Sequence, residues 1–320
     1  MSGGGRIAAV TAVVAVAAGG IAAASGVITG DSGAPQAPVA AASPTTSPKP
    51  VAYTAPKVDW GVTRAPAKHR IRPNLKGRPA AGILIDASTG EVMWALRPDS
   101  RRSIASLTKM MNALVALDRA KPDRKVLISR YAGTMGGSTV GGLPIGERVR
   151  VGTLLRGMMI VSGNDAANAL AEGLGPGRSR FVARMNARAR AMHLPCTRFT
   201  SPEGLGTGNR SCARDLAVIG RAVLADRDLA RIVAREWDGI AVGRNGKRLL
   251  HNRNPLVQRH YPGITGIKTG YTAAAGYCLV ASAKRGNRKL IAVLLGEDEQ
   301  ARMMQRLLDS GFRALRRQAD

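Results

Sequence analysis

The order of strand-like and helix-like segments is the feature that most constrains how this chain can fold. Residues 81–86 and 91–96 read as two strands joined by a turn at 88–90, and residues 276–283 and 289–295 repeat that pattern near the other end. Most of the chain between them shows apolar residues at helical spacing. Strands at both ends with helices between imply one antiparallel sheet built from remote parts of the chain, with a helical half inserted in the middle. The sequence therefore predicts an α/β (α+β) fold.

Individual elements can be placed along this layout. Apolar residues recur at helical spacing from Leu107 to Leu117, which predicts a helix over residues 106–118. The Asn245-Gly246 pair is a strong hairpin turn signal between two short strands. The other elements expected from periodicity are helices over 154–161, 165–172, 179–192, 213–225 and 299–315, and strands over 240–243 and 247–251.

The first 78 residues do not read as part of the globular unit. Residues 7–29 carry no charge and follow Arg6, and as a helix they would span about 35 Å. Residues 1–30 are therefore typical of an export signal peptide or of a retained membrane anchor. Residues 31–78 are rich in Pro, Ala and Ser and become basic, which predicts a linker, and residues 79–320 form the expected domain. Either fate of the leader places most of the protein outside the cytoplasm.

Charge and composition limit the partners. The formal net charge is +27, from 48 Lys and Arg against 21 Asp and Glu, and residues 1–78 supply +7 of it. Such a balance favours polyanions, but only 3% of the residues are aromatic, which leaves few platforms for stacking bases. We therefore expect no nucleic-acid partner and an affinity for anionic wall polymers or a membrane surface.

Cysteine and histidine usage argues against a metal site. Three cysteines exclude a zinc site with four cysteine ligands, and the four histidines show no metal-ligand spacing. The sequence therefore predicts neither a metal nor a cofactor. Outside the cytoplasm a disulfide between Cys196 and Cys212 is permitted and would close a short loop, while two unpaired buried thiols are the alternative.

A serine and a lysine at the start of the 106–118 helix are the first candidates for catalysis. Ser106 and Lys109 are three residues apart, so both side chains lie on one helix face within reach of each other. A serine nucleophile needs a neighbouring base, and a lysine can serve only when burial or a second cation lowers its pKa. The helix amino terminus favours negative charge developing at Ser106. Such a pair on its own is also common at ordinary helix starts.

Two further motifs can complete a site of this kind. Ser162-Gly163-Asn164 interrupts two apolar helices, so Ser162 is available to relay a proton and Asn164 to donate a hydrogen bond to a substrate carbonyl. Lys268-Thr269-Gly270 is expected on a strand, where Gly270 lets a ligand approach the backbone closely. Each motif alone has an ordinary structural explanation, but chance is a poor explanation for all three in this order and on this layout.

Together these motifs resemble those of the penicillin-recognising serine enzymes. The sequence around these motifs is similar to that of the D-alanyl-D-alanine carboxypeptidases of the S11 serine peptidase family, over about residues 79–318. The resemblance implies a β-lactamase/transpeptidase-like fold. It rests on Ala105–Met111, Val161–Ala167, Met185-Asn186, Ser201–Leu205, Ala213–Leu216 and Gly266–Thr272.

The resemblance also implies a mechanism, in which Ser106 attacks the carbonyl between the last two D-alanines of a peptidoglycan stem pentapeptide and forms an acyl-enzyme. Lys109 would accept the serine proton, and Ser162 with Asn164 would assist proton transfer and hold the substrate. The backbone N–H groups of Ser106 and Tyr271 would form the oxyanion hole, and β-lactam antibiotics would acylate the same serine. Such an enzyme acts in the cell wall or on the outer side of the cytoplasmic membrane. The residues implied to bind substrate are Lys268, Thr269, Gly270, Tyr271, Thr272 and Arg302.

Several alternatives share part of this pattern. A β-lactamase uses the same serine chemistry, but neither Glu172 nor Glu203 lies in the Glu-X-X-Leu-Asn context that such enzymes use to activate water. Glu203 stands where many relatives have His, which leaves the role of that side chain open. The chain has no Gly-X-Ser-X-Gly segment of a Ser-His-Asp hydrolase, and its intact motifs argue against a catalytically silent binding protein. Cleavage of cross-links as an endopeptidase is an alternative to trimming stem peptides.

Overall fold

The computed structural model describes residues 61–64, 70–243 and 246–317 of the chain. The predicted leader and most of the predicted linker lie outside the described residues. The chain divides into two units, Met1–Val51 and Ala52–Asp320, and all described residues belong to the second. Among the described residues, no helix combines the length and the apolar character that a membrane span requires.

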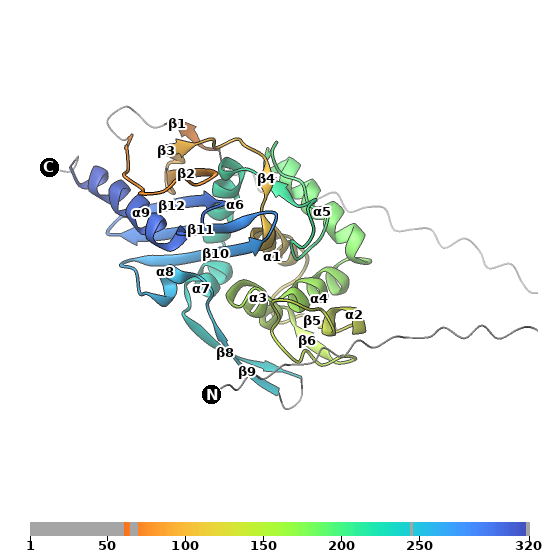
Figure 1. Ribbon diagram of the computed structural model, residues 1–320. Helices are drawn as coiled ribbons and strands as arrows, with labels where there is room; N and C mark the ends of the chain where they lie inside the picture. Colours follow the sequence, from red (N-terminus) through yellow and green to blue (C-terminus); the bar gives the residue numbers. More distant parts are fainter. Residues whose placement is uncertain (1–60, 65–69, 244–245, 318–320) are drawn as a thin grey trace, which may run out of the picture. The chain divides into compact units, whose positions relative to one another are not determined.

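A six-stranded sheet organises the second unit (Figure 1). The strand order is β1-β3-β2-β12-β11-β10, so strands from the beginning of the domain lie beside strands from its end. All neighbours are antiparallel except β1 and β3, which run parallel. This arrangement confirms the sheet predicted from both ends of the chain. The strands are β1 (Thr63–Arg64), β2 (Ala81–Asp86), β3 (Glu91–Leu96), β10 (Ile264–Thr272), β11 (Gly276–Arg285) and β12 (Arg288–Leu295).

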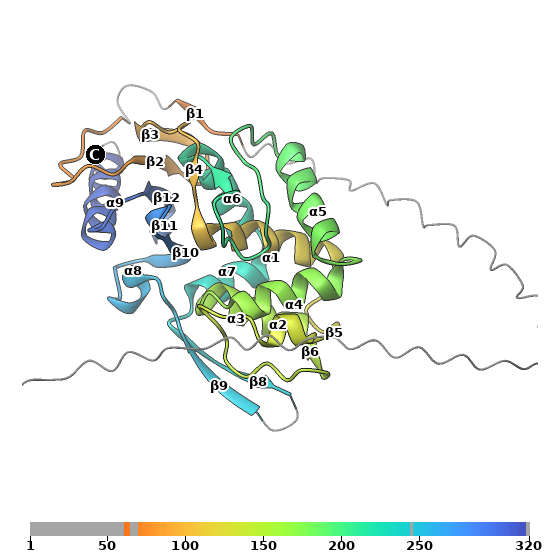
Figure 2. The ribbon, with the colours of Figure 1, turned by 45° about the vertical axis from the view of Figure 1, so that its right-hand side comes forward.

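Helices cover both faces of the sheet, which explains the nearly continuous apolar runs in its central strands (Figure 2). Successive side chains along a strand point to opposite faces. In β12, Ile291 and Val293 face the helical half, whereas Leu290 and Leu294 face α9 (Gln300–Arg316) on the other side. Because both faces are buried, a register shift of one residue would exchange the two sets of side chains.

The helical half is inserted between β3 and β10 and packs on the face opposite α9 (Figure 2). α6 lies directly on β2 and β12, and α1 connects this layer to the other helices. The helices expected from periodicity are present, with ends shifted by a few residues. The helices of this half are α1 (Thr108–Arg119), α2 (Arg130–Gly133), α3 (Val151–Ile160), α4 (Asn164–Leu174), α5 (Arg178–Ala191), α6 (Ala213–Ala225) and α7 (Arg227–Ala234). The short helix α8 (Pro255–Gln258) instead contacts β10 and α9, and its Leu256 is buried in the core on the α9 face.

Short strand pairs tie the helices together. The hairpin expected around Asn245-Gly246 is present as β8 and β9, although residue 245 lies outside the described ranges. The other two pairs have strands of only two or three residues, too short to produce a periodic signal in the sequence. The pairs are β4 (Arg102–Ser103) with β7 (Arg210–Ser211), β5 (Lys125–Leu127) with β6 (Arg148–Arg150), and β8 (Trp237–Val242) with β9 (Gly246–His251).

Part of the segment assigned to the linker packs against the sheet. The Ile71 N–H donates to the Met93 carbonyl at 2.9 Å, and Leu75 is buried in the core on the α9 face. β1 also precedes residue 79 and pairs with β3. Packed residues thus begin before residue 79, the boundary expected from composition. The composition of residues 31–78 does not reveal these packed residues, because a segment that is polar on average can dock through two apolar side chains.

Candidate active site

Ser106 lies in a short 3-10 turn, η2 (Ala105–Leu107), between strand β4 and helix α1. The preceding residue, Ala105, has a φ of +46°, a left-handed conformation that is costly for a residue with a side chain. Gly204 packs so closely on this turn that a Cβ at position 204 would lie 2.1 Å from the Ala105 carbonyl oxygen. The turn is thereby held in its strained form and presents Ser106 at the start of α1.

Lys109 lies one helical turn after Ser106 and has no solvent exposure. Its Nζ is 2.8 Å from Ser106 Oγ, 2.8 Å from Asn164 Oδ1 and 2.7 Å from the Glu203 carbonyl oxygen. A neutral amine has two N–H donors and one lone pair. It can therefore donate to Asn164 and Glu203 and still accept the proton of Ser106.

Burial is the main reason that the Lys109 amine is easily deprotonated. It lowers the pKa of Lys109 from 10.5 to about 7; the carboxylates of Glu203 and Asp165 oppose the decrease, and the Arg253 guanidinium adds to it. A substantial fraction of Lys109 is therefore neutral near pH 7. Lys109 thus meets the condition for a lysine base given in the sequence analysis, namely that burial or a second cation lowers its pKa.

A second buried lysine approaches from the sheet. The Nζ of Lys268 on β10 donates to Ser162 Oγ at 2.9 Å and to the Thr269 carbonyl at 2.9 Å. Burial, together with the charges of Lys109 and Arg253, holds the pKa of Lys268 well below its usual range. Ser162 is itself buried and has a φ of +66°, so the loop between α3 and α4 is also strained. The Ser162 hydroxyl thus lies within hydrogen-bond distance of the Lys268 amine.

Asn164 is fixed at the first position of α4. Its amide donates to the Gly136 carbonyl at 3.0 Å, which orients the side-chain oxygen toward Lys109. The neighbouring Asp165 carboxylate accepts hydrogen bonds from the Val140 N–H at 2.9 and 3.0 Å. Burial raises the pKa of Asp165, and these backbone donors oppose the rise. The loop before β6 is therefore tied to the α4 terminus beside the site.

The edge strand β10 lies against the nucleophile turn. A Cβ on Gly270 would lie 3.0 Å from the Ile104 carbonyl and 3.1 Å from the Ser106 nitrogen, so only glycine permits this approach without adjustment. Thr269 and Thr272 are half-buried, and Tyr271 is 57% exposed. β10 is the outer strand of the sheet, so part of its backbone is free to pair with a bound peptide. Roles for these residues in substrate binding stay predictions.

Two residues named in the sequence analysis, Arg302 and Glu203, have surroundings that differ from those of the other candidate site residues. Arg302, on α9, is 75% exposed in its side chain and pairs with Glu299 at 3.6 Å. Within the described residues it forms no hydrogen bond or ion pair with Lys268 or Thr272. Glu203 is buried and contacts Lys109 through its backbone carbonyl, while its carboxylate accepts a hydrogen bond from Asn168 at 3.2 Å. Glu203 thus hydrogen-bonds to Lys109 through its backbone, and its carboxylate acts on the Lys109 pKa through its charge.

Arg253 was not found from the sequence. It follows β9, and its guanidinium donates to Ser138 Oγ at 2.9 Å, in the loop that holds Asn164. Its charge lowers the pKa of both Lys109 and Lys268. It lies outside every motif, and one cation among 48 Lys and Arg carries no signal of its own.

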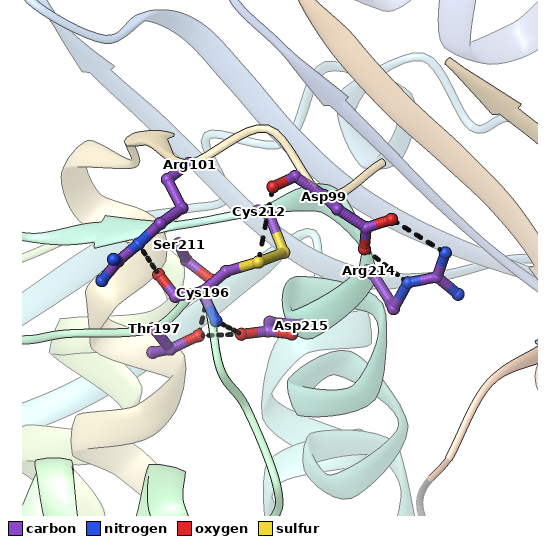
Figure 3. The surroundings of a disulfide bond; sticks show 8 residues. All are labelled: Asp99, Arg101, Cys196, Thr197, Ser211, Cys212, Arg214 and Asp215. Carbon is purple, nitrogen blue, oxygen red and sulfur yellow. Dashed lines mark hydrogen bonds and ion pairs between the residues drawn. A yellow bond between two sulfur atoms is a disulfide. The ribbon is translucent and has the colours of Figure 1, made fainter. Parts of the chain in front are cut away.

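A disulfide joins Cys196 to Cys212, the residue that precedes α6 (Figure 3). Asp215 accepts a hydrogen bond from the Cys196 N–H at 2.9 Å. Arg101 donates to the Cys196 carbonyl at 3.1 Å and directly precedes β4, the strand that leads to Ser106. The disulfide therefore braces the segment that carries the nucleophile.

Within the described ranges, one group of side chains is spaced closely enough to hold a metal ion, namely Asp99, Cys196 and Cys212. The two sulfur atoms are bonded to each other, and the Asp99 carboxylate accepts hydrogen bonds from Arg214 at 2.6 and 3.1 Å (Figure 3). These ligand atoms are engaged in structural bonds.

Comparisons with known proteins agree with this geometry. The chain matches the D-alanyl-D-alanine carboxypeptidase family over residues 70–299, and it belongs to that family, the S11 peptidases. It is 37% identical over 241 residues to D-alanyl-D-alanine carboxypeptidase DacF of Bacillus subtilis, a match that covers 72% of this chain and 61% of the relative. The chain therefore spans less than two thirds of the length of that relative.

Solved structures of similar proteins have the same fold. A D-alanyl-D-alanine carboxypeptidase from Mycobacterium tuberculosis superposes with a TM-score of 0.71 at 34% identity, covering 76% of this chain and 94% of that one. A Streptomyces DD-transpeptidase superposes with a TM-score of 0.67 at 31% identity, covering 73% and 97%. The β-lactamase/transpeptidase-like fold implied by the resemblance is thus confirmed.

The pH dependence of acylation should follow the Lys109 amine. Because a base acts only when neutral, the rate should rise with pH, with a midpoint near the pKa of about 7. Arg253→Gln removes a charge that lowers this pKa, so the midpoint should move to higher pH, whereas Arg253→Lys keeps the charge and should leave it unchanged. The measurement is the rate of labelling by a fluorescent penicillin across pH. Equal profiles for Arg253→Gln and the parent would contradict the assigned role of Arg253.

Removal of the disulfide should destabilise the fold. Cys196 and Cys212 are 16 residues apart, and closing a loop of this size contributes about 3 kcal/mol in the chain-entropy estimate. The double variant Cys196→Ser/Cys212→Ser should lose about 2–4 kcal/mol of unfolding free energy in urea titrations. A reducing agent should lower the stability of the parent and leave that of the variant unchanged. Equal stability of the two proteins without reductant would show that the bond does not brace the fold.

Proposed function

We propose that this chain is a serine-type D-alanyl-D-alanine carboxypeptidase, which removes the terminal D-alanine from peptidoglycan stem pentapeptides through an acyl-enzyme on Ser106. One observation carries the proposal: the buried Lys109 amine lies 2.8 Å from Ser106 Oγ and has a pKa of about 7. This combination supplies a base for the serine at neutral pH, without histidine or metal. Family membership supports the choice of substrate.

Acylation begins when Ser106 Oγ attacks the carbonyl carbon of the penultimate D-alanine and Lys109 takes the hydroxyl proton. Negative charge develops on the carbonyl oxygen, toward the backbone N–H groups of Ser106 and Tyr271. The C–N bond then breaks, and the departing D-alanine nitrogen receives the proton that Lys109 took from Ser106, so the Lys109 amine becomes neutral again. Ser162 is suited to deliver that proton because its hydroxyl accepts a hydrogen bond from Lys268 at 2.9 Å.

Deacylation repeats these transfers with water as the nucleophile. Lys109 takes a proton from the attacking water, the ester bond to Ser106 breaks, and the serine oxygen regains its proton. Lys268, Thr269 and Thr272 are assigned to the terminal carboxylate of the substrate, with Gly270 and Tyr271 along the bound peptide. Arg302 is kept as a further candidate for this carboxylate, although its own ion pair is with Glu299. A β-lactam would follow the same first step and remain on Ser106.

The site of action is proposed to be outside the cytoplasm. The uncharged segment over residues 7–29 supports export, either as a cleaved signal or as a retained anchor. The disulfide between Cys196 and Cys212 fits an oxidising compartment, since such bonds are rare in the cytosol. Peptidoglycan lies in that same compartment.

The test combines product release with location of the adduct. A pentapeptide ending in D-Ala-D-Ala should release one D-alanine per turnover, and mass spectrometry of the penicillin-treated protein should place the adduct on Ser106. An adduct on another residue would overturn the assignment. Sustained hydrolysis of nitrocefin in place of slow stoichiometric acylation would indicate a β-lactamase.

A further inference from the structure

A concave surface lies beside the first half of α3, toward the opposite end of this helix from Ser162. We call it the α3–α7 groove: it is formed by the residues after α1, the β5–β6 pair, the start of α3, and α7 with β8, and it has a volume of about 710 Å³. In Figures 1 and 2 these elements gather on the lower side of the molecule, away from β2 and β3. Arg156 is the lining residue of α3 nearest to Ser162 in the sequence, and the six residues between these positions correspond to about 9 Å along the helix.

Positive charge dominates the lining of the groove. Two carboxylates, Asp123 and Asp228, also line it, and the buried Asp238 lies next to it. The positive charges therefore exceed the negative ones by three. The lining contains no aromatic residue. The cations are Lys125, Arg148, Arg150, Arg156, Arg231 and Arg235.

Ion pairs with the buried carboxylate of Asp238 hold one wall of the groove in position. Asp238 is 5% exposed and pairs with Arg156 at 3.5 Å and with Arg235 at 2.9 Å. One carboxylate cannot neutralise two guanidinium groups, so this wall keeps a net positive charge. Its arginines are already oriented, which lowers the entropy cost of binding an anion.

The opposite wall consists of cations without a counter-ion. Lys125, Arg148 and Arg150 are exposed, and they form no ion pair with any of the residues that the structure describes. Lys125 lies directly opposite Arg150 in the β5–β6 register, an arrangement that destabilises a strand pair by like-charge repulsion. Arg148 and Arg150 are two positions apart on one strand, about 7 Å along β6. Unpaired positive charge that costs stability indicates an anionic ligand, and two phosphates about 7 Å apart along a chain would match Arg148 and Arg150.

We propose that the α3–α7 groove binds a linear polymer that carries one phosphodiester in each repeat. Arginine presents a fork of donors that matches two phosphate oxygens, and five of the six cations are arginines. A groove with cations on both walls fits a chain that enters it better than it fits a flat lipid surface. The absence of aromatic side chains from the lining disfavours single-stranded nucleic acid, whose bases stack on such side chains.

This binding goes beyond the proposed peptidase activity and does not depend on it. A polymer held in the groove would anchor the enzyme beside its insoluble substrate without contacting Ser106, Lys109 or Lys268, none of which lines the groove. Binding is measured without turnover, so failure of either proposal leaves the other testable.

The experiment compares two triple variants of the full chain with equal loss of charge. Lys125→Gln/Arg148→Gln/Arg150→Gln changes the groove, and Arg190→Gln/Lys284→Gln/Arg288→Gln changes exposed cations elsewhere. The probe is poly(glycerol phosphate), titrated at several salt concentrations. The groove variant should bind about tenfold more weakly or worse, and its log-log salt slope should fall by about 2 to 3. The control should stay within about twofold of the parent, because its cations do not line the groove. Both variants should release D-alanine from a free pentapeptide at the parental rate.

Three results would overturn the inference. Equal weakening by both triple variants would show that diffuse surface charge binds the polymer. If the parent protein did not bind poly(glycerol phosphate), this class of ligand would be excluded. If the groove variant lost binding to phosphatidylglycerol vesicles but kept binding to the polymer, the surface would face a membrane instead.

Discussion

Replacing Ser106 with alanine should abolish D-alanine release and penicillin labelling while the protein stays folded. The Ser106 hydroxyl lies 2.8 Å from the Lys109 base and is the proposed nucleophile, so the rate of product release should fall by about 10⁴-fold or more. Ser106 is half-buried at the start of α1, and removing one oxygen leaves the apolar contacts of η2 unchanged. The measurements are D-alanine release, labelling by a fluorescent penicillin, and the thermal unfolding midpoint.

Ser100→Ala is the matched control for this experiment. Ser100 is also half-buried and lies in the loop after β3, apart from the catalytic residues. Its replacement should leave product release and labelling at the parental level. Release of D-alanine by Ser106→Ala at the parental rate would exclude an acyl-enzyme on this serine.

Replacing Lys109 should slow the reaction nearly as much as replacing Ser106, because it removes the base that accepts the serine proton. Lys109→Met fills the same buried space but cannot accept the serine proton, so acylation should slow by about 10²- to 10⁴-fold, the range of general-base catalysis. Lys109→Arg should fail as well, because a guanidinium stays charged at any working pH. Stopped-flow labelling by a fluorescent penicillin measures the effect directly.

The fold of the Lys109 variants needs a separate control. Lys109→Met leaves Asn164 Oδ1 and the Glu203 carbonyl without their hydrogen bond from Nζ, so some loss of stability is expected. Lys289→Met, on β12 and away from the site, gives a matched lysine replacement that should keep full activity. Fast acylation by a folded Lys109→Met protein would show that another group removes the serine proton.

The sequence predicted the architecture well because burial sets clear patterns. The strands at 81–86 and 91–96 appear at those residues. All six residues of β2 are buried, so its register has little freedom, and β3 pairs with it along the hairpin. The helix over 213–225 likewise matches α6. Ser106, Lys109 and Ser162 come together with Lys268, as the order of the motifs implied, because α1, the α3–α4 loop and β10 converge at one sheet edge.

What the sequence missed depends on contacts between distant residues. Arg253 acts on both lysines through space, and the Glu203 carbonyl binds Lys109 through a backbone atom that no side-chain pattern reveals. The short pair β5 and β6 is held by tertiary contacts and has no period of its own. The net charge of +27 could not reveal the α3–α7 groove either, because a net charge does not say where in the fold the cations lie.

The joining of both chain ends in one sheet has a consequence for when the enzyme becomes active. Ile83 of β2 lies opposite Val293 of β12, so the core of the sheet cannot close until the last strands have been synthesised. Lys268 reaches Ser162 only in that closed state. Long-range pairing of this kind is slow compared with helix formation. A chain that is still being synthesised would therefore carry its nucleophile but not its assembled catalytic centre, and the proposed activity would begin only once the carboxyl-terminal strands had docked.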